Sequence, residues 1–201
     1  SAAGSLEQRA FNNLLEQTQQ LKGITTSLLL LAQADAGQLK LSVEEIPLSE
    51  EVETIVEDAQ VLASDWNIGF QLSIQPQVKV WGDRGLLRMA LLNLLTNAVR
   101  YNEPGGSVSL TLTVHQAVEI TICNTGPGIP DADQPRIFDR FYRVDQPRAS
   151  EGLGLGLSLA REIVLAHQGR LVLRESRPGR TCFSVFLKPH PTGARPPESV
   201  A

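Results

Sequence analysis

Two asparagines stand four residues apart in the middle of the chain, in the segment Asn93-Leu94-Leu95-Thr96-Asn97-Ala98. Residues at this spacing share one face of a helix, so Asn93 and Asn97 present two amide side chains next to each other. Amide oxygens are hard, neutral ligands, and Mg²⁺ prefers such oxygens together with water and triphosphate oxygens. Alone, such a pair more often lies on a solvent-exposed face, so its meaning depends on the segments around it.

Two glycine-rich segments follow, Asn124-Thr125-Gly126-Pro127-Gly128-Ile129 and Gly152-Leu153-Gly154-Leu155-Gly156-Leu157. In the first, Gly126 and Gly128 allow positive φ and let the backbone approach a flat ligand. The second runs directly into a predicted helix, and free amides at a helix N-terminus bind phosphate oxygens. It is neither a P-loop, because no Gly-Lys-Ser/Thr follows, nor a dinucleotide-binding fingerprint, because its context differs.

Aromatic and cationic residues lie near both segments. Arg100 and Tyr101 end the helix that carries the asparagines, where a cation can meet phosphate and a ring can lie near a base or ribose. In the segment Phe138-Asp139-Arg140-Phe141, two aromatic residues flank a charged pair, and Arg143 follows shortly after. The plainest interpretation of these aromatics is two core residues on a short helix.

In this order, the four segments resemble the N, G1, F and G2 boxes of the catalytic domain of sensor histidine kinases, and the resemblance extends over about residues 6–188. It implies ATP and Mg²⁺ as ligands, with Asn97 binding the metal and Asn93 directed toward the phosphates or a metal-bound water. It implies a catalytic set of Asn93, Arg100 and Arg143, and a lid over ATP whose near end is anchored by Phe138 and Phe141. The nucleotide contacts that it implies are Asn93, Asn97, Arg100, Tyr101, Asn124, Gly126, Gly128, Ile129, Phe138, Phe141, Gly152, Gly154, Gly156 and Leu157.

The chain departs from the usual family pattern at position 124, where the family has an aspartate that accepts the adenine amino group. The oxygen of Asn124 can accept the same hydrogen bond, but the amide can also flip and present its donor. We therefore expect a weaker affinity for ATP, or a weaker preference for adenine over guanine, than the usual pattern gives.

The same superfamily contains ATP hydrolases such as DNA gyrase, in which a glutamate one helical turn before the metal-binding asparagine activates water. That position is Asn93 here, so attack by water is expected to be slow. A histidine acceptor needs no strong base, because a neutral imidazole already carries a lone pair. The expected reaction is therefore transfer of the γ-phosphoryl group to histidine.

The chain has three histidines, His115, His167 and His190, and none has the sequence surroundings of a phosphoacceptor. The acceptor is expected on a helix absent from this chain, which would make the chain a truncated piece of a larger kinase that cannot phosphorylate itself.

Two alternatives to a histidine kinase stay open. One is a serine/threonine kinase of the anti-sigma-factor type, which usually keeps the glutamate. The other is a degenerate nucleotide-binding scaffold.

Hydrophobic periodicity predicts the elements that position these residues. Residues 6–38 form a predicted helix with apolar residues at alternating steps of three and four, typical of a bundle, ended near Gly37. Ser49 and Asp83 are predicted to cap later helices. The helix after Ser49 is predicted to end near residue 65, the helix after Asp83 near 97 and the last helix at 167, and a short helix is predicted near 136–141. The predicted strands are 39–46, 68–74 paired with 78–81, 107–114 paired with 117–123, 171–174 and 181–187. This pattern predicts an α/β (α+β) two-layer sandwich, a mixed but mostly antiparallel sheet packed on helices and preceded by a long N-terminal helix. The resemblance identifies it as a Bergerat-type fold.

The expected organisation is residues 1–5 as a cloning remnant, 6–38 as the second helix of a dimerisation hairpin, 39–188 as the catalytic domain and 189–201 as a disordered tail. A net charge of -4 gives no reason to expect nucleic-acid binding. No apolar run approaches the roughly 18 residues of a membrane span, so contact with a membrane is expected only through missing segments.

The resemblance implies three kinds of partner: the helix that carries the acceptor histidine, a response regulator and a second copy in the full-length protein. It also implies that this chain is the cytoplasmic portion of an inner-membrane protein.

Cys123 and Cys182 lie in strand-like sequence, and we interpret them as buried thiols in a reducing compartment rather than as a disulfide.

Overall fold

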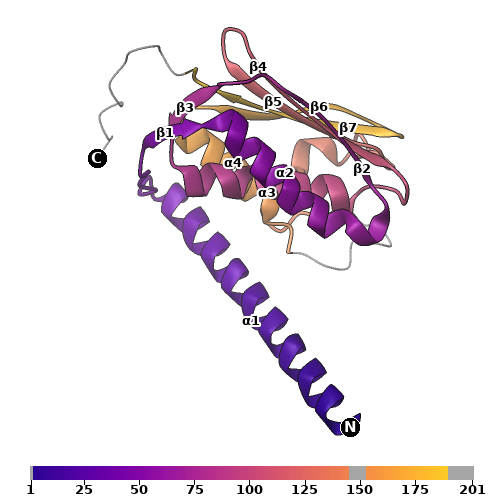
Figure 1. The fold of residues 1–201 in the computed structure, drawn as a ribbon. Helices are drawn as coiled ribbons and strands as arrows, with labels where there is room; N and C mark the ends of the chain where they lie inside the picture. Colours follow the sequence, from indigo (N-terminus) through magenta and orange to yellow (C-terminus); the bar gives the residue numbers. More distant parts are fainter. Residues whose placement is uncertain (1, 145–152, 190–201) are drawn as a thin grey trace. The chain divides into compact units, whose positions relative to one another are not determined.

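The computed structural model describes residues 2–144 and 153–189, and the chain divides into two units, Ser1–Leu39 and Lys40–Ala201. The first unit is essentially the long helix α1 (Ala2–Asp35) (Figure 1). Gly37 has a φ of 64°, and its N–H donates to the carbonyl of Ala34, so the predicted stop signal is confirmed. Most of the predicted tail, from residue 190 onward, lies outside the described residues.

The second unit has helices on one face of a mixed sheet, which confirms the predicted two-layer sandwich (Figure 1). In the described residues, the larger sheet has five strands in the order β2-β4-β5-β7-β6, and only the β2–β4 pair is parallel. A smaller sheet pairs β1 with β3. The strands are β1 (Glu44–Pro47), β2 (Gly69–Ile74), β3 (Lys79–Gly82), β4 (Ser107–Val114), β5 (Val118–Asn124), β6 (Arg170–Arg177) and β7 (Arg180–Leu187). The helices are α2 (Leu48–Ala63), α3 (Arg84–Arg100) and α4 (Gly156–Ala166), with short 3₁₀ turns η1 (Ser64–Trp66) and η2 (Gln134–Arg136).

The core lies between the sheet and the helices. Strands β4 and β5 alternate buried apolar residues with polar ones, and the apolar residues face the helices. Fully burying an aliphatic side chain contributes about 1.5–3 kcal/mol. The largest fully buried side chains of this layer are Ile55, Leu94, Leu95, Leu110, Leu112, Ile120, Ile122, Leu159 and Ile163.

The predicted pairing of residues 68–74 with 78–81 is wrong. Strand β2 instead pairs in parallel with β4, and β3 pairs with β1. The cap prediction for Ser49 is also wrong, because α2 begins at Leu48 and has no side-chain cap. Instead of capping α2, the Ser49 hydroxyl donates to the carbonyl of Gln75 and accepts from the N–H of Val78, so it binds both ends of the turn between β2 and β3. The Asp83 prediction is confirmed, because its carboxylate accepts from the N–H of Leu86 at 3.0 Å.

Two further expectations need correction. The short helix expected at residues 136–141 is a 3₁₀ turn at Gln134–Arg136 followed by irregular backbone. Cys123 and Cys182 are not free thiols but form a disulfide between β5 and β7. They face each other directly in the register of these strands, and no local pattern in the sequence shows that β5 and β7 are neighbours.

Candidate nucleotide-binding site

One pocket collects residues from segments far apart in the chain. Its walls come from the second half of α3, the end of β5 and the loop after it, the loop after η2, the start of α4, and β7. The lining residues are Asn97, Ala98, Tyr101, Asn124, Pro127, Gly128, Ile129, Ile137, Tyr142, Arg143, Val144, Leu157, Thr181 and Phe183. The asparagine helix, the loop after β5 and the start of the last helix therefore share a single cleft.

Helix α3 places its two asparagines differently. Asn97 lines the pocket, whereas Asn93 is not among the lining residues. The Asn93 amide nitrogen donates to the carbonyl of Met89 at 2.9 Å, and a Cβ added to Gly156 would lie 2.9 Å from the Asn93 oxygen. Asn93 thus lies where α3 meets the first residue of α4, and a side chain at 156 would displace the Asn93 amide from its present position.

Asn124 ends β5 and is buried, with only 8% of its surface exposed. Its amide nitrogen donates to the carbonyl of Thr125 at 2.6 Å and lies 3.5 Å from the carbonyl of Tyr101. A flipped amide would place its oxygen against two carbonyl oxygens, so these neighbours fix the nitrogen toward the backbone. The remaining side-chain atom, an acceptor oxygen, is the one that a ligand in the pocket can meet.

The loop after β5 is fixed to the β6–β7 turn. Gly128 has a φ of 78°, and a Cβ there would lie 2.7 Å from the backbone carbonyl carbon of Arg177. The N–H of Ile129 donates to the Ser176 hydroxyl at 2.8 Å. Both requirements, a left-handed backbone and the absence of a side chain, explain why a glycine stands at 128.

The phenylalanine segment and the last glycine segment are paired through their backbones. The N–H of Phe141 donates to the carbonyl of Gly154 at 3.0 Å. Gly154 has a φ of 70°, and a Cβ there would lie 2.6 Å from the carbonyl oxygen of Tyr142. Phe141 itself adopts a φ of 62° and is 59% exposed. Phe138, in contrast, packs edge-on against Phe183 at 6.1 Å between ring centroids.

Tyr142 is a pocket residue that the sequence reasoning missed. Its hydroxyl donates to the carboxylate of Asp133 at 2.6 Å, and the guanidinium of Arg136 lies 4.2 Å from its ring centroid. The hydrogen bond to Asp133 is the main reason that the pKa of Tyr142 is raised. Ile137, Thr181 and Phe183 were missed as well. Residues 181–187 were predicted to form a strand, but the sequence did not show that this strand pairs with β5 and so lies beside the pocket.

Seven predicted residues within the described ranges are not among the pocket-lining residues: Asn93, Arg100, Gly126, Phe138, Phe141, Gly154 and Gly156. Arg100 is exposed at the end of α3 and does not line the pocket, although Arg143 does. Gly152 lies outside the described residues, so only the later part of its segment can be placed.

Comparison with known proteins identifies the family. The family model for histidine kinase-, DNA gyrase B- and HSP90-like ATPases matches residues 82–191, more than half of the chain. The chain belongs to this ATPase family. Within it, the chain is 35% identical over 184 residues to the adaptive-response sensory kinase SasA of Thermosynechococcus vestitus, covering 90% of this chain and 48% of that protein. It is 37% identical over 185 residues to the sensor histidine kinase CusS of Escherichia coli O157:H7, covering 90% of this chain and 38% of that protein.

Solved structures agree with this assignment. The mycobacterial sensor histidine kinase MprB is 31% identical, with a TM-score of 0.65 over 74% of this chain and 99% of that chain. The full-length kinase ShkA, solved in complex with AMPPNP, has the same fold, with a TM-score of 0.77 and 24% identity over 95% of this chain and 40% of that chain. The chain spans less than half the length of the two curated relatives, SasA and CusS. Among the helices that the structure describes, none combines the length and apolar character that crossing a membrane requires.

Proposed function

We propose that residues 39–188 bind Mg-ATP and transfer its γ-phosphoryl group to a histidine on a dimerisation helix of the same sensor kinase. The observation that carries this proposal is the shared pocket, where Asn97, Asn124 and Leu157 meet from three separate motifs. The named functions of SasA and CusS support a sensor kinase, and the AMPPNP complex of ShkA supports an ATP site in this fold.

The wider organisation is part of the same proposal. Residues 6–38 would be one helix of a dimerisation hairpin, so the full-length protein would act as a homodimer. The phosphoryl group would pass from the acceptor histidine to a response regulator. This chain would then be the cytoplasmic portion of a kinase anchored in the inner membrane, as the family resemblance implies.

The pocket residues suggest how ATP would lie. The oxygen of Asn124 would accept from the adenine amino group, and the ring of Tyr101 would lie against the base or ribose. The backbone around Gly154, Gly156 and Leu157 would meet the phosphates at the start of α4. Arg143 would contribute positive charge at the same end, and the segment from Phe138 to Phe141 would anchor a lid.

The residues present fit a magnesium ion held jointly with the nucleotide. Asn97 offers a neutral amide oxygen from a rigid helix, and Mg²⁺ is commonly held by one or two protein oxygens together with phosphates and waters. When bound, the ion neutralises charge on the phosphates and orients them for in-line displacement. The role of Asn97 is therefore to fix the position of the triphosphate relative to α3.

Position 93 favours transfer to histidine over hydrolysis. The Asn93 amide cannot accept a proton from water, and its nitrogen is already engaged with the carbonyl of Met89. A neutral imidazole nitrogen needs no such base. It would form a bond to the γ-phosphorus as the bond from that phosphorus to the β–γ bridging oxygen breaks, leaving ADP. The chain's part in this step is positioning and neutralisation of charge.

A binding measurement tests the nucleotide site. We expect a fluorescent ATP analogue to bind with a Kd between about 1 μM and 1 mM, or about -8 to -4 kcal/mol. Asn97→Ala should abolish the Mg²⁺-dependent part of that affinity, because it removes the amide oxygen that we propose would hold the metal. Asn12→Ala, an exposed asparagine on α1, is the matched control and should change nothing. Absence of any binding by the wild-type chain would favour the degenerate-scaffold alternative.

A second experiment tests the reaction. The chain is mixed with Mg-ATP and a separate dimerisation hairpin that carries an acceptor histidine. We expect acid-labile phosphate on the hairpin, which is characteristic of phosphohistidine. Acid-stable phosphate would favour the serine/threonine kinase alternative, and release of inorganic phosphate without any phosphorylated hairpin would contradict transfer.

A further inference from the structure

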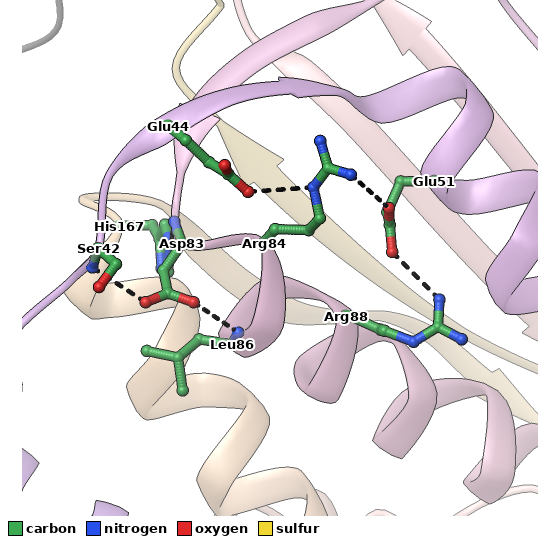
Figure 2. Close-up of polar contacts among 8 residues, drawn as sticks. All are labelled: Ser42, Glu44, Glu51, Asp83, Arg84, Leu86, Arg88 and His167. Atoms are coloured by element: carbon green, nitrogen blue, oxygen red, sulfur yellow. Dashed lines mark hydrogen bonds and ion pairs between the residues drawn. The ribbon is translucent and has the colours of Figure 1, made fainter.

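His167 lies at the C-terminal end of α4, at the opposite end of that helix from the pocket residue Leu157. Its Nε2 accepts a hydrogen bond from the backbone N–H of Asp83 at 2.9 Å. Its Nδ1 lies 2.7 Å from the carbonyl oxygen of Ile163 on its own helix. The imidazole therefore connects the end of α4 with the residue that caps α3, and Figure 2 shows the ring beside Asp83.

These two contacts define the state of the ring. A backbone N–H can only donate, so Nε2 must carry its lone pair and the proton must be on Nδ1, where it is donated to Ile163. Burial lowers the pKa of His167, while the hydrogen bond to Ile163 and the negative charge of Asp83 oppose the shift. Asp83 is the charged group that acts on the ring among the described residues. A protonated ring would place a second donor against the Asp83 N–H and break the contact.

Gly82 gives an independent sign that the ring is seated against the backbone. A Cβ added at Gly82, the last residue of β3, would lie 2.8 Å from Cδ2 of His167 and 3.1 Å from its Nε2. The absence of a side chain at 82 is thus what lets the imidazole reach the next N–H along the chain.

The contact between His167 and Asp83 forms a junction between α4 and α3, and Asp83 also connects this junction to the segment before β1. Its Oδ1 accepts from the N–H of Leu86 and caps α3, and its Oδ2 accepts from the N–H of Ser42, both at 3.0 Å (Figure 2). Next to it, Arg84 and Arg88 form ion pairs with Glu51 of α2. Those pairs are partly exposed and carry modest energy. The hydrogen bonds of Asp83, by contrast, have single defined geometries.

The junction controls where the two site helices lie relative to each other. Helices α3 and α4 run antiparallel, since Asp83 meets His167 at one end and Asn93 meets Gly156 at the other. Both spans correspond to about 15 Å of helix, so a fixed contact at one end aligns the other. Most of the buried residues of the two helices are apolar, and apolar contacts are non-directional, so they define the register less strictly than a hydrogen bond does.

We propose that neutral His167 is a positioning residue for the nucleotide site. It holds α4 in register with α3, so that the phosphate-binding start of α4 stays level with Asn93 and Asn97. This inference rests on the proposed function, because it assigns His167 a role in ATP binding although the residue touches no ligand. It also makes the affinity for ATP depend on the protonation of one buried imidazole.

Substitutions that keep or remove the acceptor test this role. In His167→Gln, the amide oxygen can reach the Asp83 N–H and does not titrate. In His167→Phe, the ring remains but the acceptor is lost. Should the Phe variant fail to fold, His167→Asn, which is too short to reach Asp83, replaces it. His115→Gln, at an exposed histidine of the β4–β5 hairpin, is the matched control.

The readout is the affinity for a fluorescent ATP analogue with Mg²⁺ from pH 7.5 to 4.5, expressed as the ratio of each variant to wild type so that titration of the nucleotide cancels. At pH 7.5, we expect the Gln variant to bind within about twofold of wild type and the Phe variant about tenfold more weakly. Because burial lowers the pKa of His167, wild type should still match the Gln variant at pH 6.5 and should lose affinity relative to it only toward the acidic end of the range. The control should follow wild type throughout.

Failure of the two proposals can be told apart. If wild type binds but the acceptor-free variant binds equally well, or if the ratio of wild type to the Gln variant stays constant over the whole pH range, the positioning role is overturned and the nucleotide site stands. If wild type does not bind the analogue at any pH, the proposed function itself fails.

Discussion

A single amide decides how this chain would recognise adenine. The sequence shows that residue 124 is asparagine, but it does not show which end of the amide faces the pocket. That is decided by the carbonyls of Thr125 and Tyr101, which lie in different segments and both require a donor. The structure thus removes the ambiguity of a flipped amide, and it leaves an oxygen suited to the amino group of adenine rather than to the carbonyl of guanine.

We predict that Asn124→Ala weakens binding of ATP by about tenfold, or about 1.4 kcal/mol, because a buried hydrogen bond to the base is lost. Binding of GTP, which offers no amino group at that position of the ring, should change much less. Titration of both nucleotides against wild type and variant measures the effect. Equal losses for ATP and GTP would show that Asn124 supports the fold of the pocket instead of reading the base.

His167 also makes folding stability depend on pH. Its pKa in the folded protein is lowered, mainly by burial. Below about pH 6.5, the unfolded chain therefore takes up a proton that the folded chain does not, and the free energy of unfolding decreases as the pH falls. We predict that His167→Gln removes this component. As the pH falls from 7.5 to 5.5, the free energy of unfolding of the Gln variant should therefore rise relative to that of wild type. Urea denaturation at both pH values tests this, with His115→Gln as control, and parallel curves for wild type and the Gln variant would contradict it.

At the scale of elements, local signals were reliable where they acted within one segment. The Asp83 cap and the β4–β5 hairpin follow from neighbouring residues, and both are confirmed. The pairing of β2 and β3 was not predictable in this way. Ser49 has the chemistry of a cap, but its hydroxyl is used by a turn distant in sequence, and a parallel neighbour for β2 leaves no local trace. For the same reason, the β7 side of the pocket could not be assigned before β5 and β7 were known to pair.

That pairing also produces the disulfide. Cys123 and Cys182 are separated by 59 residues, and closing a loop of this length stabilises a fold by up to about 4 kcal/mol. We predict that a reducing agent lowers the free energy of unfolding of wild type, and that the double variant Cys123→Ala/Cys182→Ala does not respond to it. Urea denaturation with and without dithiothreitol measures the difference. The same stability of wild type under both conditions would contradict the prediction.

ATP affinity should be nearly independent of this bond. Successive residues of a strand point to opposite faces, so Asn124 and Thr181 face the pocket while the cysteines next to them face away. We expect the double alanine variant to bind the ATP analogue within about twofold of wild type. The disulfide would then stabilise the sheet without contributing to the site.

For the whole molecule, the two units differ in how completely their apolar residues are covered. In α1, Phe11, Leu14 and Leu21 are 66%, 63% and 64% exposed. These residues follow one another at steps of three and seven, the spacing with which helices pack into bundles. An exposed apolar stripe of this kind favours association with other helices. The unit Lys40–Ala201, by contrast, encloses its core between sheet and helices.

We therefore predict that the chain self-associates through α1. Leu21→Glu places a charge in the apolar stripe and should weaken association at least about tenfold. Val61→Glu, at a residue of α2 that is 74% exposed, adds the same charge to the other unit and serves as the control. Sedimentation velocity over a range of protein concentrations measures both. A wild-type chain that stays monomeric, or one that Val61→Glu dissociates equally well, would contradict association through α1. Since every pocket residue lies in the unit Lys40–Ala201, the dissociated Leu21→Glu variant should still bind the ATP analogue with wild-type affinity.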